Sequence, residues 1–326
     1  MNVLVLGGAG YIGSHMCKLL STQGHQVVVF DNLSTGHREA VKWGPLIVGD
    51  ILVKDDLENL FAQHEHFDLI IHFCAKSLVG ESVKQPNDYY RNNVVGTLNL
   101  LDQMVKTGHD KLVFSSTAAV FGTPSVEFID ETQPRLPINP YGQSKKIVED
   151  ILQDYFQAFG LKSVCLRYFN ACGADPDADI GERHEPETHL IPNILKSVLS
   201  GSQQKLKVFG NAYPTADGTC VRDYIHINDL ASAHLLAGQY LDNNQGAYAF
   251  NLGNGSGFSV LDVISAAEHV VGNKIDYDIE EARAGDPPVL VADATLARQA
   301  LGWEPQYKEI EKIIATAWGW HQNERF

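Results

Sequence analysis

The sequence has little cysteine, no closely spaced pair of cysteines and no long apolar run. Its five cysteines, Cys17, Cys74, Cys165, Cys172 and Cys220, are scattered over 326 residues. An odd number of dispersed thiols argues against a disulfide framework or a C-x-x-C metal site, and it suits a reducing compartment. No apolar stretch approaches the roughly 20 residues that a membrane-spanning helix needs. We therefore expect a cytoplasmic protein without a membrane span or a metal centre.

Basic residues are also scarce. Lysine and arginine number 25 against 40 aspartates and glutamates, and the formal net charge is -15. Because the basic residues are dispersed, the charge argues against nucleic acid or an anionic membrane as a partner. A chain of 326 residues exceeds the usual size of a single core, so we expect two lobes around a cleft. The opening MNVLVLGG has no basic segment before its short apolar run, which indicates a first strand and not a signal peptide.

Short β-branched runs alternate with helical patterns in the first half of the chain. NVLVLG, QVVVFD, DLIIHFCA and KLVFSS have the composition of buried strands, and helical segments such as GTLNLLDQMVKTG separate them. This alternation predicts right-handed crossovers and an α/β fold with a doubly wound parallel sheet. After RYFNACG, residues 167–173, the pattern changes to a polar loop and then to further helices and strands. A second, smaller lobe is therefore expected to begin there.

A glycine-rich turn follows the first strand. GGAGYIG places Gly7, Gly10 and Gly13 between a strand and a helix, where glycine permits a tight turn and close approach of a pyrophosphate. A tight turn without a ligand is the alternative. Asp31 ends the second strand 18 residues after Gly13, where a carboxylate can accept the ribose hydroxyls of NAD and repel the 2'-phosphate of NADP. Its alternative is a loop cap before Asn32. Asp50, in GDI after the third strand, is a candidate contact for the adenine amino group.

Tyr141 and Lys145 carry the candidate chemistry. They stand four residues apart at the start of an amphipathic helix, so their side chains share one face, and of twelve tyrosines only Tyr141 has lysine at this spacing. Lowering a phenol pKa from about 10 toward neutrality would make a base, and Lys145, the helix N-terminus and a cationic nicotinamide could share that effect. An exposed helix face is the alternative. KLVFSSTAAVFG adds the hydroxyls of Ser115, Ser116 and Thr117 at a strand end; alone, Thr117 would be a strand-end cap.

An ordered series of segments extends nearly end to end. It comprises GGAGYIGSH, DNLSTG, HFCAKSLVGESV, YYRNNVVGTLNLL, FSSTAAVFG, NPYGQSK, LRYFNACGA, GTCVRDYIHINDLA and YAFNLGNGSGFSVLDV. The chain thereby resembles the extended short-chain dehydrogenase/reductase family. The resemblance implies a Rossmann-like domain at 1–171, with returning segments at about 224–256 and a C-terminal helix at about 306–322. It implies a smaller mixed α/β lobe at 172–223 and 257–305 that binds a UDP-sugar.

The resemblance also implies roles for individual residues. For NAD it implies Gly7, Gly10, Tyr11, Ile12, Gly13, Asp31, Asn32, Asp50, Ile51, Phe73, Asn93, Tyr141, Lys145 and Tyr168. Tyr141 is implied as the base, Lys145 as its modulator and Thr117 as a hydroxyl partner of both base and substrate. For the UDP-sugar it implies Thr117, Asn170, His189, Leu190, Phe209, Arg222, Arg283, Asp286 and Leu290. Left to themselves, Arg222 and Arg283 would be surface ion-pair residues and His189 a loop histidine.

The implied activity is reversible epimerisation at C4 of UDP-galactose and UDP-glucose through a 4-keto sugar. Family members usually form homodimers through a four-helix bundle, to which YYRNNVVGTLNLLDQMVKTG and the Tyr141 helix would contribute here. Leu290 stands where a tyrosine narrows the sugar pocket of some relatives, so UDP-N-acetylhexosamines are a further expected substrate class.

Three alternatives differ in their sequence requirements. A 4,6-dehydratase of the same family would carry an Asp-Glu pair after Thr117, where this chain has Ala118 and Ala119. A decarboxylase fits the segments less well than an epimerase does. A non-catalytic NAD-sensing protein would have no use for Tyr141 and Lys145. Lys76 is not assigned to the cofactor, because the lysine of some relatives falls one position later, at Ser77.

Overall fold

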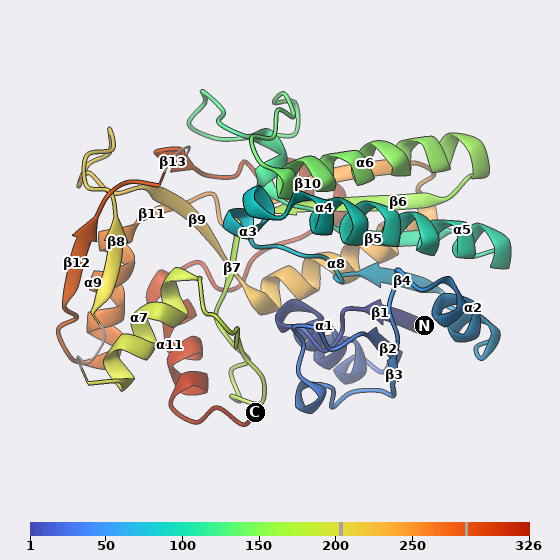
Figure 1. Cartoon of the computed structure of the whole chain (residues 1–326), viewed down its shortest axis with the longest axis horizontal. Coiled ribbons are helices and arrows are strands. Elements are labelled where there is room, and N and C mark those ends of the chain that lie inside the picture. Colours follow the sequence, from blue (N-terminus) through green and yellow to red (C-terminus); the bar gives the residue numbers. More distant parts are fainter. Residues whose placement is uncertain (202–204, 284–285) are drawn as a thin grey trace.

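A seven-stranded parallel sheet organises the first part of the molecule. The computed structural model describes residues 1–201, 205–283 and 286–326. The strand order in this sheet is β10-β6-β5-β4-β1-β2-β3 (Figure 1). The strands are β1 (Asn2–Leu6), β2 (Gln26–Asp31), β3 (Leu46–Val48), β4 (Leu69–His72), β5 (Lys111–Ser115), β6 (Lys162–Tyr168) and β10 (Ala247–Leu252). The order runs outward from β1 in both directions, which confirms the predicted doubly wound α/β fold.

Two apolar cores lie on opposite faces of this sheet. Successive side chains of a strand point to opposite faces, so Val3 and Val5 enter one core while Leu4 and Leu6 enter the other. Helices α1 (Tyr11–Thr22), α8 (Ile227–Asn243) and α10 (Thr295–Leu301) cover the first face. Helices α2 (Lys54–Ala62), α5 (Thr97–Thr107) and α6 (Pro140–Phe159) cover the second. Figure 1 shows α5 and α6 side by side on the outside of that face.

Short helices lie in the connections between these strands and longer helices. They are η1 (Arg38–Ala40), α3 (Val79–Lys84), α4 (Pro86–Tyr89), η2 (Tyr90–Gly96) and η3 (Ala118–Phe121). Among the residues described, no helix is long and apolar enough to cross a membrane.

A third core fills the second part of the molecule. Its four-stranded sheet contains β7 (Asn170–Cys172), β9 (Val221–His226), β11 (Gly257–Ser259) and β13 (Val289–Leu290), and β8 (Leu206–Phe209) pairs with β12 (Tyr277–Glu280). Helices α7 (Leu190–Leu199), α9 (Val260–Val271) and α11 (Ile310–His321) pack around this core. These elements lie beyond the carboxyl end of the main sheet (Figure 1).

The two last helices differ from the sequence expectation. Ile313, Ile314 and Ala317 of α11 are buried with residues of α7 and α9, although a helix at about 306–322 was expected in the first lobe. Conversely, Ala297 and Leu301 of α10 are buried in the first core, although 257–305 was expected in the second lobe. An apolar helix face predicts that the helix packs against a core, but it does not identify that core. The division into lobes stays a prediction. Within it, α10 joins the first core and α11 the third, opposite to the expectation.

Candidate functional site

The turn between β1 and α1 is built for close approach of a ligand. Gly7 has φ of 81°, and a Cβ there would lie 2.7 Å from the backbone nitrogen of Cys74. A Cβ on Gly13 would run into the backbone of Gly7, so this position also requires glycine. Gly10 is open, because a Cβ there would meet only the Gly7 oxygen at 3.4 Å. Gly10 caps α1 without a side-chain hydrogen bond, and the first turn has no acidic residue. The free N–H groups and the helix dipole fit the pyrophosphate of a dinucleotide.

Asp31, Asn32 and Asp50 lie together beside this turn. Asp31 ends β2 and accepts hydrogen bonds from the backbone N–H of Ala9 at 2.9 Å and of Leu33 at 2.8 Å. Burial raises the pKa of Asp31, and the two backbone hydrogen bonds offset only part of this rise. Asn32 donates to Asp50 at 2.9 Å, so the ends of β2 and β3 are joined. The three polar groups are therefore positioned for the adenosine part of a dinucleotide.

Apolar and aromatic residues form the surroundings of this turn. Ile12 and Phe73 pack against the first core, and Ile51 is buried in the second. The Tyr11 hydroxyl donates to the Gly173 carbonyl at 2.6 Å, so it links α1 to the segment after β7. Asn93 is held by the chain itself: its amide bonds both backbone groups of Lys76 and also donates to Ser144 at 2.9 Å. Asn93 thus fixes the strand-end loop against α6.

The start of α6 places Tyr141. Asn139 is the N-cap and accepts a hydrogen bond from Gly142 N–H at 2.8 Å, and Pro140 occupies the first helical position. Tyr141 is 9% exposed, and the Thr117 side chain lies close enough to lower its pKa. Thr117 itself caps η3 by accepting from Ala119 N–H at 3.1 Å. Thr117, two residues after β5, therefore lies beside Tyr141 and also has the alternative role of a cap.

The environment of Tyr141 contains Thr117 and a buried lysine. Burial raises the pKa of Tyr141, and the nearby Thr117 side chain lowers it. Lys145, predicted to lower this pKa, donates to the Ser115 carbonyl at 2.6 Å and lies 4.5 Å from the Phe114 ring centroid. Its effect on Tyr141 stays a prediction.

Lys145 is one of the largest fully buried side chains, with 2% exposure. Burial lowers its pKa to about 8. The ammonium can therefore lose or hold a proton near neutral pH, unlike an ordinary lysine. Behind it, Ser115 is hydrogen-bonded to the Tyr168 hydroxyl, which brings the predicted Tyr168 to the same strand ends.

The sequence reasoning missed Glu149, which lies one turn beyond Lys145 on α6. Glu149 is buried and accepts from Ser116 at 2.5 Å. Its carboxylate also pairs with Arg167 at 2.6 Å and with Arg135 at 2.9 Å. This network joins the segment after β5, next to Thr117 in the chain, to β6 and α6. The only sequence signal was the spacing of four from Lys145, because the arginines and serine lie far away along the chain.

Apart from Thr117, the residues predicted for the UDP-sugar fall into two groups and one separate pair. Arg222 lies 3.3 Å from Asp286 and donates to the carbonyl oxygens of Val221 and Pro287. Leu290 is the register partner of Arg222. Asn170 reaches the same strand by donating to the Asp223 carbonyl at 2.8 Å. Arg222 lies on β9, and the other three residues lie beside this strand.

The second group is Arg283 with Phe209, and the separate pair is His189 with Leu190 at the start of α7. The Arg283 guanidinium lies 4.1 Å over the Phe209 ring, a geometry suited to a flat base or an anion. His189 and Leu190 lie at the start of α7, and His189 pairs with Glu182, not with the arginines. Burial lowers the pKa of His189, but the Glu182 carboxylate raises it by more, so the net shift is upward.

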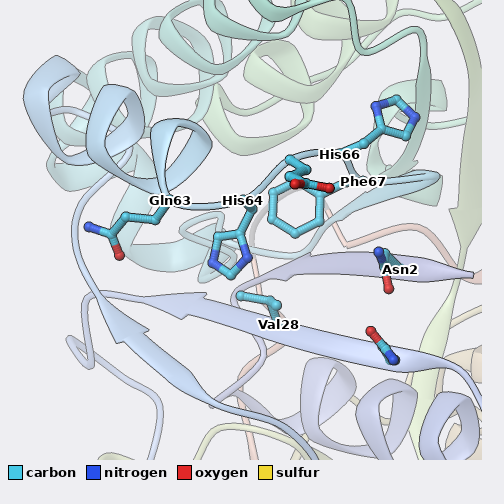
Figure 2. Close-up of a pocket in the computed structure, with 8 residues that line it drawn as sticks. Asn2, Val28, Gln63, His64, His66 and Phe67 are labelled. Carbon is cyan, nitrogen blue, oxygen red and sulfur yellow. The ribbon is translucent and has the colours of Figure 1, made fainter.

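A hollow elsewhere on the molecule is not part of this site. Figure 2 shows Asn2, Val28 and Phe67 lining it, together with Gln63, His64 and His66. Asn2 and Gln26 begin β1 and β2, so the hollow is at the amino ends of the strands. In doubly wound sheets ligands bind at the carboxyl ends. The candidate site is therefore at the other edge, where Gly10, Asp31, Thr117 and Tyr141 are found.

Known proteins resemble this chain over nearly its whole length. The NAD dependent epimerase/dehydratase family matches residues 3–253. A UDP-glucose 4-epimerase of Halalkalibacterium halodurans is 49% identical over 322 residues, covering 99% of this chain and 96% of that protein. The crystal structure of UDP-glucose 4-epimerase from Brucella ovis in complex with NAD has a TM-score of 0.94 and 48% identity, covering 98% of this chain and 97% of that one. The one from Bifidobacterium longum in complex with NAD+ and UDP has a TM-score of 0.93 and 37% identity over 99% of both chains.

Proposed function

The chain belongs to the NAD dependent epimerase/dehydratase family, and from that premise we propose that it catalyses the reversible 4-epimerisation of UDP-galactose and UDP-glucose. NAD is the cofactor, and when bound it supplies the hydride acceptor and donor for C4 of the sugar. The observation that carries the proposal is the burial of Tyr141 beside the Thr117 side chain, at the same edge of the sheet as the Gly7–Gly13 turn. A hydroxyl of a bound sugar would meet a base and a hydroxyl partner there.

In this proposal each residue has a defined task. Tyr141 takes the proton of the sugar 4-hydroxyl, directly or through Thr117, and returns it to the oxygen of the 4-keto group after the sugar has turned its other face to the cofactor. Lys145, one helical turn from Tyr141, modulates the proton affinity of Tyr141 in this proposal, because its own pKa is about 8. Gly10 and the N-terminus of α1 bind the pyrophosphate, while Asp31 and Asp50 orient the adenosine.

The UDP part of the substrate is assigned to β9 and the loops beside it. Arg222 and Arg283 offer permanent positive charge to the diphosphate, and the Phe209 ring offers a stacking face for the base. Asp286, paired with Arg222, holds that arginine in place. Asn170 presents its amide from β7. A firm hold on UDP with a loosely held sugar would let the 4-keto sugar turn its second face to the cofactor.

Conversion of UDP-galactose by the purified protein, without added NAD, tests the proposal. Appearance of UDP-glucose on chromatography supports it, and Tyr141→Phe should reduce the rate by about 10²- to 10⁴-fold through loss of the proton-transfer group. Tyr240→Phe is the matched control, since Tyr240 packs against Tyr248 and Phe250 away from the site, and its rate should stay near wild type. No conversion with or without NAD would refute the proposal. A 4-keto-6-deoxy product would instead indicate a dehydratase.

Leu290 determines the acceptance of N-acetylated sugars in this proposal. It is partly buried against Val120, Phe121 and Ile129, so a larger residue there extends into the space beside Arg222. Leu290→Tyr is expected to slow UDP-N-acetylgalactosamine at least about tenfold while UDP-galactose changes little, because one added group in a pocket changes binding by about 1–3 kcal/mol. Leu290→Met, of similar volume, is the control. Equal selectivity in all three proteins would contradict this role.

The setting of the reaction is proposed as well. Free thiols at all five cysteines support a cytoplasmic location, and the proposed substrates place the enzyme in galactose metabolism. Helices α5 and α6 are proposed to pack against their copies in a second subunit, giving a homodimer.

A further inference from the structure

Four side chains of types that bind transition metals converge between β7 and α7. They are Glu182, His184, Glu187 and His189, and one oxygen or ring nitrogen from each lies within 4.8 Å of the others. None of them has a part in the chemistry of Tyr141. We propose that these four residues form a binding site for a divalent transition metal of the zinc class, with a structural role in fixing the start of α7.

Two distances within the group match those of a small coordination shell. The Nδ1 atom of His184 lies 3.4 Å from a Glu182 oxygen and 3.5 Å from a Glu187 oxygen. Ligand atoms around tetrahedral zinc, with bonds of about 2.0–2.2 Å, lie roughly 3.3–3.6 Å apart. The Nδ1 atom of His189 is closer than this to Glu182, and its side chain, 50% exposed, has room to move outward. Two imidazoles and two carboxylates are donors that zinc accepts, whereas calcium and magnesium prefer oxygen alone.

Charge and burial favour a cation at this point. The Glu182 and Glu187 side chains are only 3% and 5% exposed, so two carboxylates repel each other in a poorly solvated place. The Oε2 atom of Glu187 is buried without a hydrogen-bond partner, and it lies 3.7 Å from the Lys196 ammonium. A divalent cation near the Oε1 atom would neutralise both carboxylates.

The backbone already holds these ligands in place. The Glu187 Oε1 atom accepts the backbone N–H groups of Thr188 at 2.8 Å and His189 at 3.0 Å. Trp320 of α11 donates to the Glu182 carbonyl at 3.1 Å. A site between these contacts would connect the segment before α7 to α11 and, through the edge of the Tyr11 ring against His184, to α1. The long segment between β7 and α7 is visible in Figure 1.

Protons are the competitor of a metal here. Although burial lowers it, the pKa of His184 is raised to about 9 by Glu182 and Glu187. The same carboxylates could therefore be satisfied by protonated histidines, and a metal must displace those protons. A second acidic group nearby, Asp175, Asp177 and Asp179, needs neither, because the Lys18 ammonium donates to all three. In the first group the histidines themselves supply the positive charge unless a metal replaces their protons.

Metal analysis of the full chain distinguishes the two possibilities. Untagged protein is stripped with a chelator, loaded with zinc chloride, passed through a desalting column and analysed by mass spectrometry. Wild type should retain about one zinc per chain, and His184→Asn at most about a tenth of that, because one of four ligands is lost. His269→Asn is the control, since His269 is an exposed residue of α9, and it should bind as wild type does.

Thermal unfolding gives a second, independent reading. Zinc should raise the melting temperature of stripped wild type and of His269→Asn, but not that of His184→Asn. Glu187→Gln keeps the oxygen that accepts the two backbone N–H groups and removes the charge, so it replaces His184→Asn where that variant folds poorly. No retained zinc in wild type, or equal zinc in wild type and both cluster variants, would overturn the proposal and leave a proton-held ion-pair network.

Discussion

At the scale of single residues, the proposed catalytic side chains are ionisable groups whose burial costs free energy. Tyr141 and Lys145 are buried. Burial raises the pKa of Tyr141 and lowers that of Lys145, so the uncharged form is favoured in both. A hydrophobic residue at either position would avoid that desolvation. This is the arrangement expected where function and stability make opposite demands on a position.

Lys145→Met should therefore stabilise the protein while it inactivates the enzyme. Burial lowers the pKa of Lys145 from 10.5 to about 8, so the folded state binds this proton less tightly than the unfolded state. The resulting penalty is fully present below pH 8 and is relieved as the pH rises toward 10.5. After allowance for the lost hydrogen bond to Ser115, we expect a gain of about 1–3 kcal/mol at pH 7.

Urea unfolding at pH 7 and pH 10 measures this effect. The gain of Lys145→Met over wild type should shrink at the higher pH, and the epimerase rate should fall by about 10²-fold or more. Lys146→Met is the control, because Lys146 is a partly exposed neighbour paired with Asp150, and its stability should change by less than about 1 kcal/mol. A loss of stability, or an equal gain at both pH values, would show that burial of the Lys145 charge does not control stability at this position.

Residue-level prediction from sequence succeeded where the spacing was local. Tyr141 and Lys145 share a helix, so a separation of four residues was enough to put them on one face. Glu149 was missed because its partners Ser116, Arg167 and Arg135 are 33, 18 and 14 residues away. The direction of Lys145 was also missed, since its bond to the Ser115 carbonyl, 30 residues away, depends on how α6 docks on β5. Contacts between elements need the tertiary arrangement.

At the scale of elements, the carboxyl edge of the sheet and the start of α6 set the site. Strand identity could be predicted, because β-branched runs between glycine-containing turns have few other stable arrangements. The assignment of α10 and α11 to cores could not, because both present an apolar face of similar kind. The Glu182–His189 group also escaped prediction: its members are close in sequence, but nothing in their spacing showed that the side chains converge.

The cap of α6 gives a prediction at this scale. Asn139 accepts the Gly142 N–H and lies two residues before Tyr141, so loss of the cap should loosen the first turn that carries the base. Asn139→Ala should destabilise the protein by about 0.5–2 kcal/mol and lower the epimerase rate more than substrate binding. Asn139→Asp, an equally good cap, should keep both. Urea unfolding and steady-state kinetics provide the comparison, and identical behaviour of the two variants would contradict the role of the cap.

At the scale of the whole molecule, the outer face of α5 and α6 is the surface that a second subunit would cover. The two helices are joined by the Tyr155 hydroxyl, which donates to Asp102 at 2.5 Å. Val95, in the turn that continues into α5, is 47% exposed, and Phe159, the last residue of α6, is 59% exposed. Apolar side chains of this size on neighbouring helices gain from burial in a helix bundle.

Val95→Glu should convert a dimer into a monomer, because a carboxylate buried without a partner at the interface is costly. Light scattering during gel filtration should give twice the chain mass of 35.9 kDa for wild type and the single mass for Val95→Glu. Leu296→Glu is the matched control: Leu296 is 42% exposed on α10, which packs on the opposite face of the sheet, and this variant should stay dimeric. If Val95→Glu keeps the wild-type mass, subunits associate through another face or not at all. Because the Tyr141–Thr117 site lies within one chain, the monomer should retain epimerase activity, which separates assembly from chemistry.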